Sequence, residues 1–422
     1  MPCFEAREHE VLQNKLFQKI DAPKLFSQST NSGNISNVKA FGLNNEFDNK
    51  WRFSYYIGLD YLDDENTIAV HVKPKIENLD YWKMLHDCLK CPEAACHASK
   101  IYDIRINKPF IEPPQNEKTR NSFILLIMHH YLILLAELIK KPMVKSYVGK
   151  RENLKSKIKG KILLSEHIKK NISNRRHYRI MCAFDEYSVD CLANQLLHSA
   201  YKICMEYKNR SFDEKISFSD YNYIESFFRN ISYIENLFET SKIKTNPLYI
   251  EYKDALYLAK IIFQLKAYNE STSSKKEFKK IPPYIIDMSM LFEVYTLYRL
   301  KESKLDIGYQ KQGNYGKVDF VEYGDKLIID TKYKTIYNDE INNKDNYRIE
   351  DIRQIAGYAR DINLLKDLYG AAGWEEKIPE CIIIYPVISK SEDCIAKVDF
   401  KKKEPIKQFH KFYKYGISVP EL

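Results

Sequence analysis

The stretch Gly316–Lys334 reads GKVDFVEYGDKLIIDTKYK and carries the clearest chemical signal in the sequence. Two runs rich in β-branched and aromatic residues flank Gly324-Asp325, a dipeptide suited to a two-residue hairpin loop with glycine first. In the register that this loop sets, Asp319 pairs directly with Asp330, and such partners have Cβ atoms about 4.5–5.5 Å apart. Because side chains alternate along a strand, Asp330 and Lys332 point to the same face. The stretch therefore predicts two facing carboxylates with a lysine beside them.

Facing carboxylates repel each other, and a divalent metal ion between them would remove that cost. The apolar run Leu327–Ile329 is typical of a strand buried on both faces, and a carboxylate that ends such a strand needs a partner or a metal. A neighbouring lysine could then contact a substrate phosphate or the attacking water, as in the metal site of a nuclease. The alternative is an exposed hairpin, where Asp and Lys often alternate on the solvated face.

Predicted helices on either side of this hairpin carry polar residues near their apolar faces. The upstream helix places Glu293 on a stripe formed by Ile286, Met290, Leu297 and Leu300. The downstream helix places Gln354 near the edge of an apolar face formed by Ile352, Ile355, Ala356 and Ala359. A glutamate on an apolar face is a candidate functional group that could complete a three-carboxylate metal shell. The alternatives are a stripe-edge glutamate that reaches solvent and an ordinary surface glutamine.

The order of these features resembles the PD-(D/E)xK nuclease superfamily. Longer segments narrow the resemblance to the McrC family, the nuclease subunit of McrBC modification-dependent restriction systems. The segments in the last third of the chain are Leu291–Glu293, Ile329–Lys334 and Gln354–Ala359. Less specific matches lie earlier, at Tyr56–Gly58, Val72–Ile76, Ile158–Ile162, Phe184–Tyr187 and Leu192–Gln195.

With the segment pattern, this resemblance implies an α+β multidomain protein. We expect an N-terminal β-rich domain at residues 1–110, where a motor would dock, and a central, mostly helical region at residues 111–270. A C-terminal α/β PD-(D/E)xK nuclease domain would follow at residues 271–422, and Ser271–Lys276 is the expected linker.

The resemblance also implies how the site works. Asp319 and Asp330 would hold Mg²⁺, for which Mn²⁺ can substitute, and Glu293 would complete or orient the shell. Lys332 would position or help to deprotonate the nucleophilic water, while Gln354 would touch substrate or hold that lysine. Lys334 is a further candidate for a phosphate contact.

The family works with a separate McrB-type AAA+ GTPase hexamer, so the expected partners are this motor and double-stranded, modified DNA. The sequence contains no G-x-x-x-x-G-K-[ST] phosphate-binding loop, and we therefore do not expect the chain to hydrolyse a nucleotide itself. A stand-alone PD-(D/E)xK nuclease and a non-cleaving DNA-binding adaptor remain the alternatives.

The net charge of +9 is concentrated in one block. Between Lys140 and Arg179 there are fourteen Lys or Arg and two acids, so this block carries +12 and the rest of the chain −3. Such a block is typical of phosphate binding, and a solvated basic face is the alternative. The candidate DNA-binding residues in it are Lys155, Lys157, Lys159 and Lys161.

The remaining composition bears on compartment and on other site types. An odd number of cysteines, nine, excludes a complete disulfide framework, and no signal-peptide pattern opens the sequence, so we expect the cytoplasm. The apolar run 123–139 predicts a buried helix, with a membrane span as the weaker alternative. One C-x-x-C in the group His86, Cys88, Cys91, Cys96 and His97 has the spacing of a zinc knuckle, but no second one follows at ribbon spacing. Cys88, Cys91 and Cys96 are therefore candidate ligands for a structural zinc ion, and an ordinary helix end is the alternative.

Overall fold

The computed structural model describes residues 3–12, 35–44, 50–113, 117–208, 218–234, 250–270, 280–334, 337, 349–389 and 396–422. The expected linker Ser271–Lys276 lies outside them. The chain forms two compact units, of which unit 1 comprises residues 1–122 and 280–422 and unit 2 comprises residues 123–279. The first and last of the three expected domains thus contribute to one compact unit, and the three-part division itself stays a prediction.

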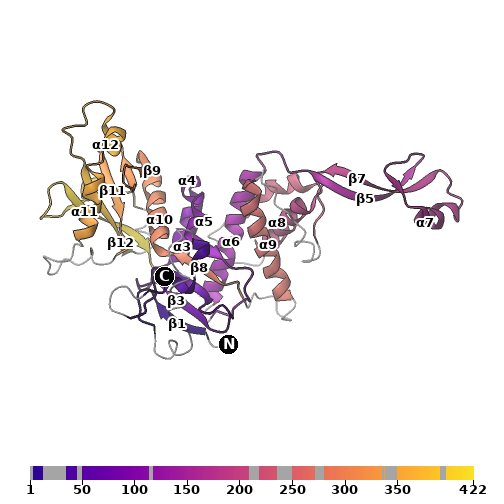
Figure 1. The fold of residues 1–422 in the computed structure, drawn as a ribbon, viewed down its shortest axis with the longest axis horizontal. Coiled ribbons are helices and arrows are strands. Elements are labelled where there is room, and N and C mark those ends of the chain that lie inside the picture. Colours follow the sequence, from indigo (N-terminus) through magenta and orange to yellow (C-terminus); the bar gives the residue numbers. More distant parts are fainter. Residues whose placement is uncertain are drawn as a thin grey trace. The chain divides into compact units, whose positions relative to one another are not determined.

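Unit 1 contains a five-stranded sheet of order β1-β3-β2-β8-β4. Its strands β1, β3 and β8 are labelled in Figure 1. Its strands are β1 (Cys3–Arg7), β2 (Tyr56–Tyr61), β3 (Ala69–Lys73), β4 (Tyr102–Ile104) and β8 (Tyr284–Asp287). β1 runs parallel to β3, and the other neighbours are antiparallel. The short helices η1 (Ile35–Asn37), η2 (Ala40–Gly42), α3 (Tyr81–Lys90), α4 (Pro92–Ala95) and α5 (Ala98–Ile101) accompany it. β8 comes from the far part of the sequence, so this sheet joins both ends of unit 1.

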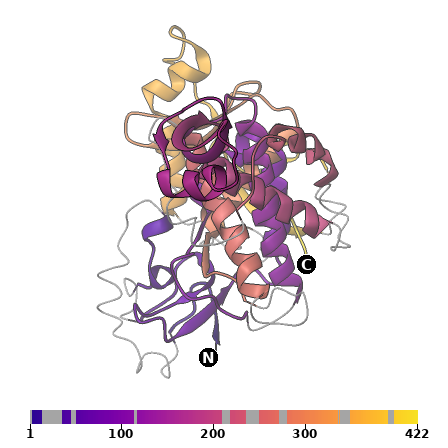
Figure 2. The same ribbon diagram turned by 90° about the vertical axis from the view of Figure 1, so that its right-hand side faces the viewer.

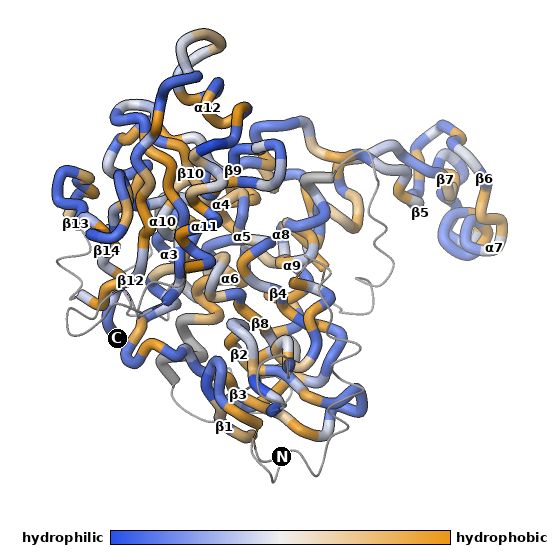
Figure 3. The backbone as a smooth tube through the Cα atoms, turned by 60° about the vertical axis from the view of Figure 1, so that its left-hand side comes forward, coloured by the Kyte–Doolittle hydropathy of each residue, from blue (hydrophilic) through white to orange (hydrophobic). Residues whose placement is uncertain are grey.

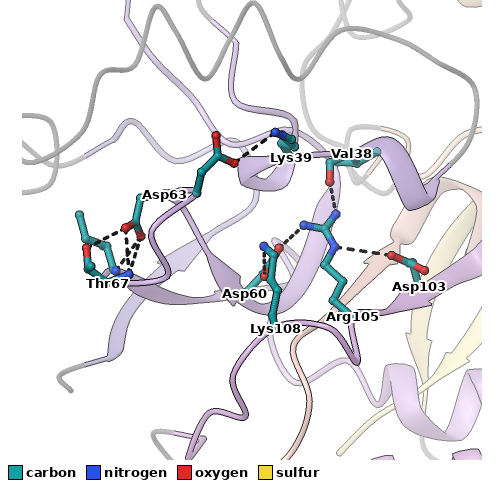
Figure 4. A network of polar contacts seen from close by, with 10 residues as sticks. Val38, Lys39, Asp60, Asp63, Thr67, Asp103, Arg105 and Lys108 are labelled. Atoms are coloured by element: carbon teal, nitrogen blue, oxygen red, sulfur yellow. Dashed lines mark hydrogen bonds and ion pairs between the residues drawn. The ribbon is translucent and has the colours of Figure 1, made fainter. Parts of the chain in front are cut away.

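A buried ion network ties the loops of this sheet together (Figure 4). Asp60 on β2 is fully buried and pairs with the guanidinium of Arg105 and, at 2.7 Å, with the ammonium of Lys108. The same guanidinium donates to the carbonyl of Val38 and lies 3.5 Å from Asp103. Because a buried carboxylate without partners would be costly, these contacts fix residue 38 and the segment after β4 on the sheet.

The second sheet of unit 1 has six strands in the order β13-β14-β12-β11-β10-β9. They are β9 (Ile307–Gln312), β10 (Lys317–Glu322), β11 (Leu327–Thr331), β12 (Glu380–Ser389), β13 (Glu404–Pro405) and β14 (Phe412–Pro420). β9, β10 and β11 form an antiparallel meander, whereas β11, β12 and β14 run parallel. The apolar runs Leu327–Ile329 of β11 and Cys381–Ile384 of β12 are buried, as expected for strands covered on both faces. Figure 3 shows the hydropathy of each residue along the chain.

The helices of this part are α10 (Met288–Glu302), α11 (Ile349–Tyr358), α12 (Ile362–Tyr369) and the short η8 (Phe400–Lys402). Buried residues of α11 and α12 form a core with Val318, Val321 and Ile328 of the meander. The predicted apolar face is largely confirmed: Ile352 and Ile355 of α11 are buried, as is Ala359 just after it, and Ala356 is half-buried.

The predicted helix around Glu293 begins later than its apolar stripe indicated. Ile286 lies in β8 and pairs with Ile57 and Tyr102, so its placement on the helix was wrong. The reason is a cap: the Asp287 side chain accepts a hydrogen bond from the Met290 backbone N–H at 2.9 Å, which starts α10 at Met288.

The hairpin register agrees with the prediction but its loop does not. Phe320 pairs with Ile329 and Glu322 with Leu327, and the next step of this register sets Asp319 opposite Asp330. The predicted two-residue loop is wrong, since residues 323–326 connect the strands. The Glu322 carboxylate explains this, because it accepts hydrogen bonds from the backbone N–H groups of Gly324 (2.9 Å) and Asp325 (2.6 Å) and so stabilises a wider turn.

Unit 2 combines helices with a long β-arm (Figures 1 and 2). Its helices are α6 (Glu117–Leu138, which begins in unit 1), α8 (Leu192–Lys208), η4 (Phe218–Phe228) and α9 (Ile250–Glu270). The buried-helix prediction for residues 123–139 is confirmed by α6, whose side chains from Phe123 to Met128 are all buried. No helix among the described residues is long and apolar enough to cross a membrane.

The β-arm is an antiparallel ribbon of β5 (Ser146–Lys155) and β7 (Arg179–Ser188), with β6 (Lys161–Ile162) beside β7. Its tip holds α7 (Leu164–His167) and η3 (Ile168–Ile172), and Figure 2 is viewed with this tip facing the reader. Most of the basic block predicted from the sequence lies in this arm.

Candidate active site

The two aspartates of the hairpin lie on the neighbouring strands β10 and β11. Asp330, the last but one residue of β11, is almost fully buried. Asp319 of β10 accepts two hydrogen bonds at Oδ2, from the backbone N–H of Thr331 at 2.7 Å and from its hydroxyl at 2.6 Å. Thr331 therefore fixes the orientation of the Asp319 carboxylate from the strand that carries Asp330.

Lys332 lies beside these carboxylates. Its Nζ is 2.5 Å from Asp330 Oδ2 and donates to Gln354 Oε1 at 2.8 Å. Gln354 in turn donates to the Tyr358 hydroxyl at 3.2 Å, one turn along α11. The structure thus brings together the lysine and the glutamine singled out in the sequence, and the glutamine holds the lysine.

Glu293 projects from α10, and a residue that the sequence did not indicate holds it. Gln310 of β9 donates from Nε2 to Glu293 Oε1 at 3.0 Å. The backbone φ of Gln310 is +47°, in the left-handed region that disfavours a side chain, and it interrupts the β9–β10 ladder at the position opposite Asp319. Neither the strained backbone nor the long-range contact has a local sequence signal.

The three carboxylates are electrostatically linked. Burial and, after it, the neighbouring charge of Asp319 raise the pKa of Asp330 to about 7, against the opposing effect of Lys332. Burial and the charge of Asp319 likewise raise the pKa of Glu293 to about 7. Burial raises the pKa of Asp319 as well, against the hydrogen bonds from Thr331. Three acids that disfavour each other's charge form a site that attracts a cation.

Lys332 responds in the opposite sense. Burial lowers the pKa of this ammonium, but the combined attraction of Asp330, Asp351 and Asp319 outweighs burial, and the net shift is upward. A lysine beside this site is therefore held in its charged form.

The structure gives Lys334 a specific partner. Its Nζ lies 2.7 Å from both carboxylate oxygens of Asp351, in the first turn of α11. The Tyr337 hydroxyl donates to Asp351 Oδ2 at 2.7 Å. A phosphate contact by Lys334 would have to compete with this ion pair, and its role in DNA binding stays a prediction. Asp351 was not predicted from the sequence, although an acidic residue in the first turn of a predicted helix could have indicated it.

Metal ligands are side chains that are arranged around one point. Across the described ranges, no three His, Cys, Asp or Glu side chains converge in an arrangement that could hold a metal ion. The three-carboxylate shell with Glu293 therefore stays a prediction. Mg²⁺ commonly binds through one or two carboxylates plus waters and substrate phosphates, so the oxygen donors Asp319 and Asp330 fit it chemically.

The candidate zinc cysteines make other contacts. Cys91 Sγ donates to Glu93 Oε2 and Cys96 Sγ to the Glu93 carbonyl, each at 3.1 Å. Cys88 is buried in α3, and burial raises the thiol pKa of all three cysteines. Raised pKa values disfavour the thiolate form that binds zinc.

The candidate DNA-binding lysines lie on the β-arm of unit 2. All four are exposed: Lys155, Lys157, Lys159 and Lys161. Lys159 Nζ lies 4.2 Å from the centre of the Phe184 ring and 3.5 Å from Glu186, which also pairs with Lys150. Most of the arm's positive charge therefore faces solvent, as a phosphate-binding surface requires.

Comparison with known proteins gives the chain a family. No curated protein sequence matches it. Two solved structures from Thermococcus gammatolerans are similar: a half-complex of McrB AAA+ hexamers with bound McrC (14% identity, 99% of this chain and 95% of that chain, TM-score 0.40), and the McrBC complex (12%, 73% and 90%, TM-score 0.30). These values carry no argument on function. A family model does match, over residues 51–367, and because that match spans most of the sequence, the chain belongs to the McrBC 5-methylcytosine restriction system components.

Proposed function

We propose that this chain is the DNA-cleaving subunit of an McrBC-like restriction system, built on a PD-(D/E)xK nuclease domain. The observation that supports this most is the group formed by the buried Asp330 and the half-buried Asp319 and Lys332 on the β10–β11 hairpin. Ion pairs that serve only stability are seldom built from several neighbouring acids, and here, besides burial, the charge of Asp319 raises the pKa of both Asp330 and Glu293.

In this proposal Asp319 and Asp330 hold Mg²⁺ and Glu293 orients the site. When bound, the metal ion supplies charge stabilisation at the scissile phosphate and lowers the pKa of water. Thr331 keeps the Asp319 carboxylate oriented, and Gln310 does the same for Glu293. Lys332, charged and held by Gln354, neutralises the charge that develops on the phosphate and positions the attacking water.

The partner in this proposal is a McrB-type AAA+ GTPase. One of the similar structures is an assembly of McrB AAA+ hexamers with bound McrC, and this sequence has no phosphate-binding loop of its own. The family description names 5-methylcytosine, so the proposed substrate is double-stranded DNA with modified bases.

Metal dependence is the direct test. Plasmid DNA carrying 5-methylcytosine should be cut by the chain together with its motor, GTP and Mg²⁺. Adding EDTA in excess over Mg²⁺ should stop this cleavage. Since GTP hydrolysis also needs Mg²⁺, hydrolysis is measured in parallel, and cleavage should be restored by Mn²⁺. Cleavage that persists after full chelation would contradict a metal-dependent nuclease.

We also propose that the β-arm contacts DNA. Reversing Lys155, Lys157, Lys159 and Lys161 to glutamate should weaken DNA association and flatten its salt dependence. Each lost phosphate contact removes about 0.9 from the log–log salt slope, so the slope should fall by up to about 3.6. DNA affinity measured over a series of salt concentrations checks this.

The matched control reverses four exposed lysines of unit 1, namely Lys377, Lys401, Lys402 and Lys407. It changes the net charge equally but leaves the arm intact, and it should leave the salt slope near that of the parent. If both variants behave alike, only the overall charge matters and the arm is not a DNA-binding surface.

A further inference from the structure

The catalytic lysine lies just beyond the end of its strand. β11 ends at Thr331, and the backbone N–H of Lys332 makes the last hydrogen bond to the neighbouring strand, to the Ile384 carbonyl at 2.8 Å. The N–H of Lys334 then turns back to the Lys332 carbonyl at 2.8 Å. The sheet therefore does not by itself fix the chain after Lys332, and other contacts must hold it.

Tyr333 supplies those contacts. Its side chain is 6% exposed, its hydroxyl donates to Glu8 Oε2 at 3.3 Å, and its carbonyl accepts a hydrogen bond from Lys75 Nζ at 2.7 Å. The same ammonium lies 4.2 Å from the centre of the Tyr333 ring. The ring also lies near Phe292, in a tilted arrangement with 6.1 Å between centroids. Both the backbone and the ring of Tyr333 are thus held.

The residues that hold Tyr333 come from the five-stranded sheet. Glu8 follows β1 and Lys75 lies just beyond β3, and the Glu8 backbone N–H donates to the Lys73 carbonyl at 3.0 Å. Glu8 Oε2 also accepts the Lys75 backbone N–H at 2.8 Å. Glu8 is 4% exposed and lies 325 positions before Tyr333 in the sequence. Burying a carboxylate costs free energy unless it is hydrogen-bonded, and the Glu8 carboxylate is hydrogen-bonded to the Lys75 backbone and to the Tyr333 hydroxyl.

We propose that Glu8, Lys75 and Tyr333 form a clamp through which the N-terminal sheet positions Lys332 for catalysis. Because Tyr333 directly follows Lys332, anchoring Tyr333 restricts the backbone of Lys332, whose side chain contacts Asp330 and Gln354. Loss of the clamp leaves the Lys332 ammonium unchanged but no longer holds it in position. A displacement of a catalytic group by about 1 Å can lower the rate on the order of a hundredfold. All three clamp members are positioning residues, and the proposal rests on the nuclease function proposed above.

The experiment measures cleavage of methylated plasmid by the full chain with its motor and GTP. Lys75→Met keeps the aliphatic stem but removes the ammonium from the Tyr333 carbonyl, and Glu8→Ala removes the acceptor. Each should lower kcat about tenfold to a hundredfold with an unchanged KM for DNA. Glu8→Gln retains an oxygen acceptor for both hydrogen bonds and should restore kcat to within about threefold. Tyr333→Phe, which loses one hydroxyl contact, should have a smaller effect than either.

Two controls remove similar contacts elsewhere in unit 1. Tyr323→Phe deletes a hydroxyl bonded to Asp367 at 2.6 Å, and Lys411→Met deletes an ammonium bonded to the Ile378 carbonyl at 2.9 Å. Both should cleave as the parent does. The unfolding midpoint and the stimulation of the motor's GTPase are recorded for every variant, because a merely structural defect lowers these together with kcat.

The outcomes distinguish a failure of the proposed nuclease function from a failure of the proposed clamp. If the parent complex does not cleave, the proposed nuclease function is wrong and the clamp has no role in it. If the parent cleaves and Lys75→Met and Glu8→Ala match it, the clamp is overturned. It is overturned too if their loss of kcat follows a loss of folding or of GTPase stimulation, or if Glu8→Gln is as defective as Glu8→Ala.

Discussion

Replacing Asp330 with asparagine should abolish DNA cleavage, by on the order of a thousandfold or more, while DNA and partner binding persist. The substitution keeps the shape of a side chain that is 1% exposed, so it opens no cavity. It removes the charged oxygen that pairs with Lys332 and that would hold the metal. Plasmid cleavage by the complex, with DNA affinity measured in parallel, checks this expectation.

The same variant has a second signature, in stability. Burial raises the pKa of Asp330 from 3.8 to about 7, so between these pH values the folded protein keeps a proton that the unfolded chain releases. The free energy of unfolding should therefore fall as pH rises through this window, and the full penalty is present above pH 7. Without metal, the variant should unfold at a higher temperature than the parent at pH 8, and the difference should vanish near pH 4.

Mg²⁺ then provides a readout independent of activity. Added metal should raise the unfolding midpoint of the parent at pH 8 and leave that of the Asp330→Asn variant nearly unchanged. Asp325→Asn, at an exposed position in the turn of the same hairpin, is the control and should cleave normally. Normal cleavage by the purified Asp330→Asn variant would end the assignment of the active site.

The second large effect concerns dependence on a motor. A chain with a nuclease site and no phosphate-binding loop has nothing of its own to couple cleavage to recognition. We expect the isolated chain to cleave methylated plasmid poorly in Mg²⁺. Adding the McrB-type motor and GTP should raise the rate by at least about a hundredfold, and the chain should in turn stimulate GTP turnover. Cleavage assays with the chain alone, with motor, and with motor plus a non-hydrolysable GTP analogue measure this.

The analogue distinguishes binding from turnover as the activating step, because it permits assembly but not hydrolysis. The Asp330→Asn variant is the matched control and should stimulate GTP turnover without cutting DNA. Robust cleavage by the chain alone, unchanged by the motor, would favour the stand-alone nuclease instead.

The sequence predicted those parts of the site that depend on local pattern. The register that opposes Asp319 and Asp330 follows from strand alternation around a turn, and it is confirmed by the pairing of β10 with β11. The contact of Lys332 with Gln354 agrees with a helix placed after the hairpin. The turn length was wrong because the Glu322 side chain caps it, which hairpin propensities do not take into account.

Other parts depend on residues that meet only in the folded chain. The left-handed backbone of Gln310 is imposed by its surroundings, since glutamine has no intrinsic preference for it. The partners of Tyr333 come from the other end of the sequence, and a periodicity within one window contains no information about them. The start of α10 was missed because β8, just before it, is recruited by the five-stranded sheet.

The recruitment of β8 has a consequence for biosynthesis. β8 lies between β2 and β4, yet a ribosome makes it only after residues 123–279. Until then the nascent chain holds two strands with open edges, which can pair with other chains. Unit 2 is continuous in sequence and can fold during this wait, whereas unit 1 closes only when Ile281 bonds back to Ile111 and β8 enters the gap. Because of this order of strands along the chain, we expect the open edges of β2 and β4 to need protection from other chains during translation.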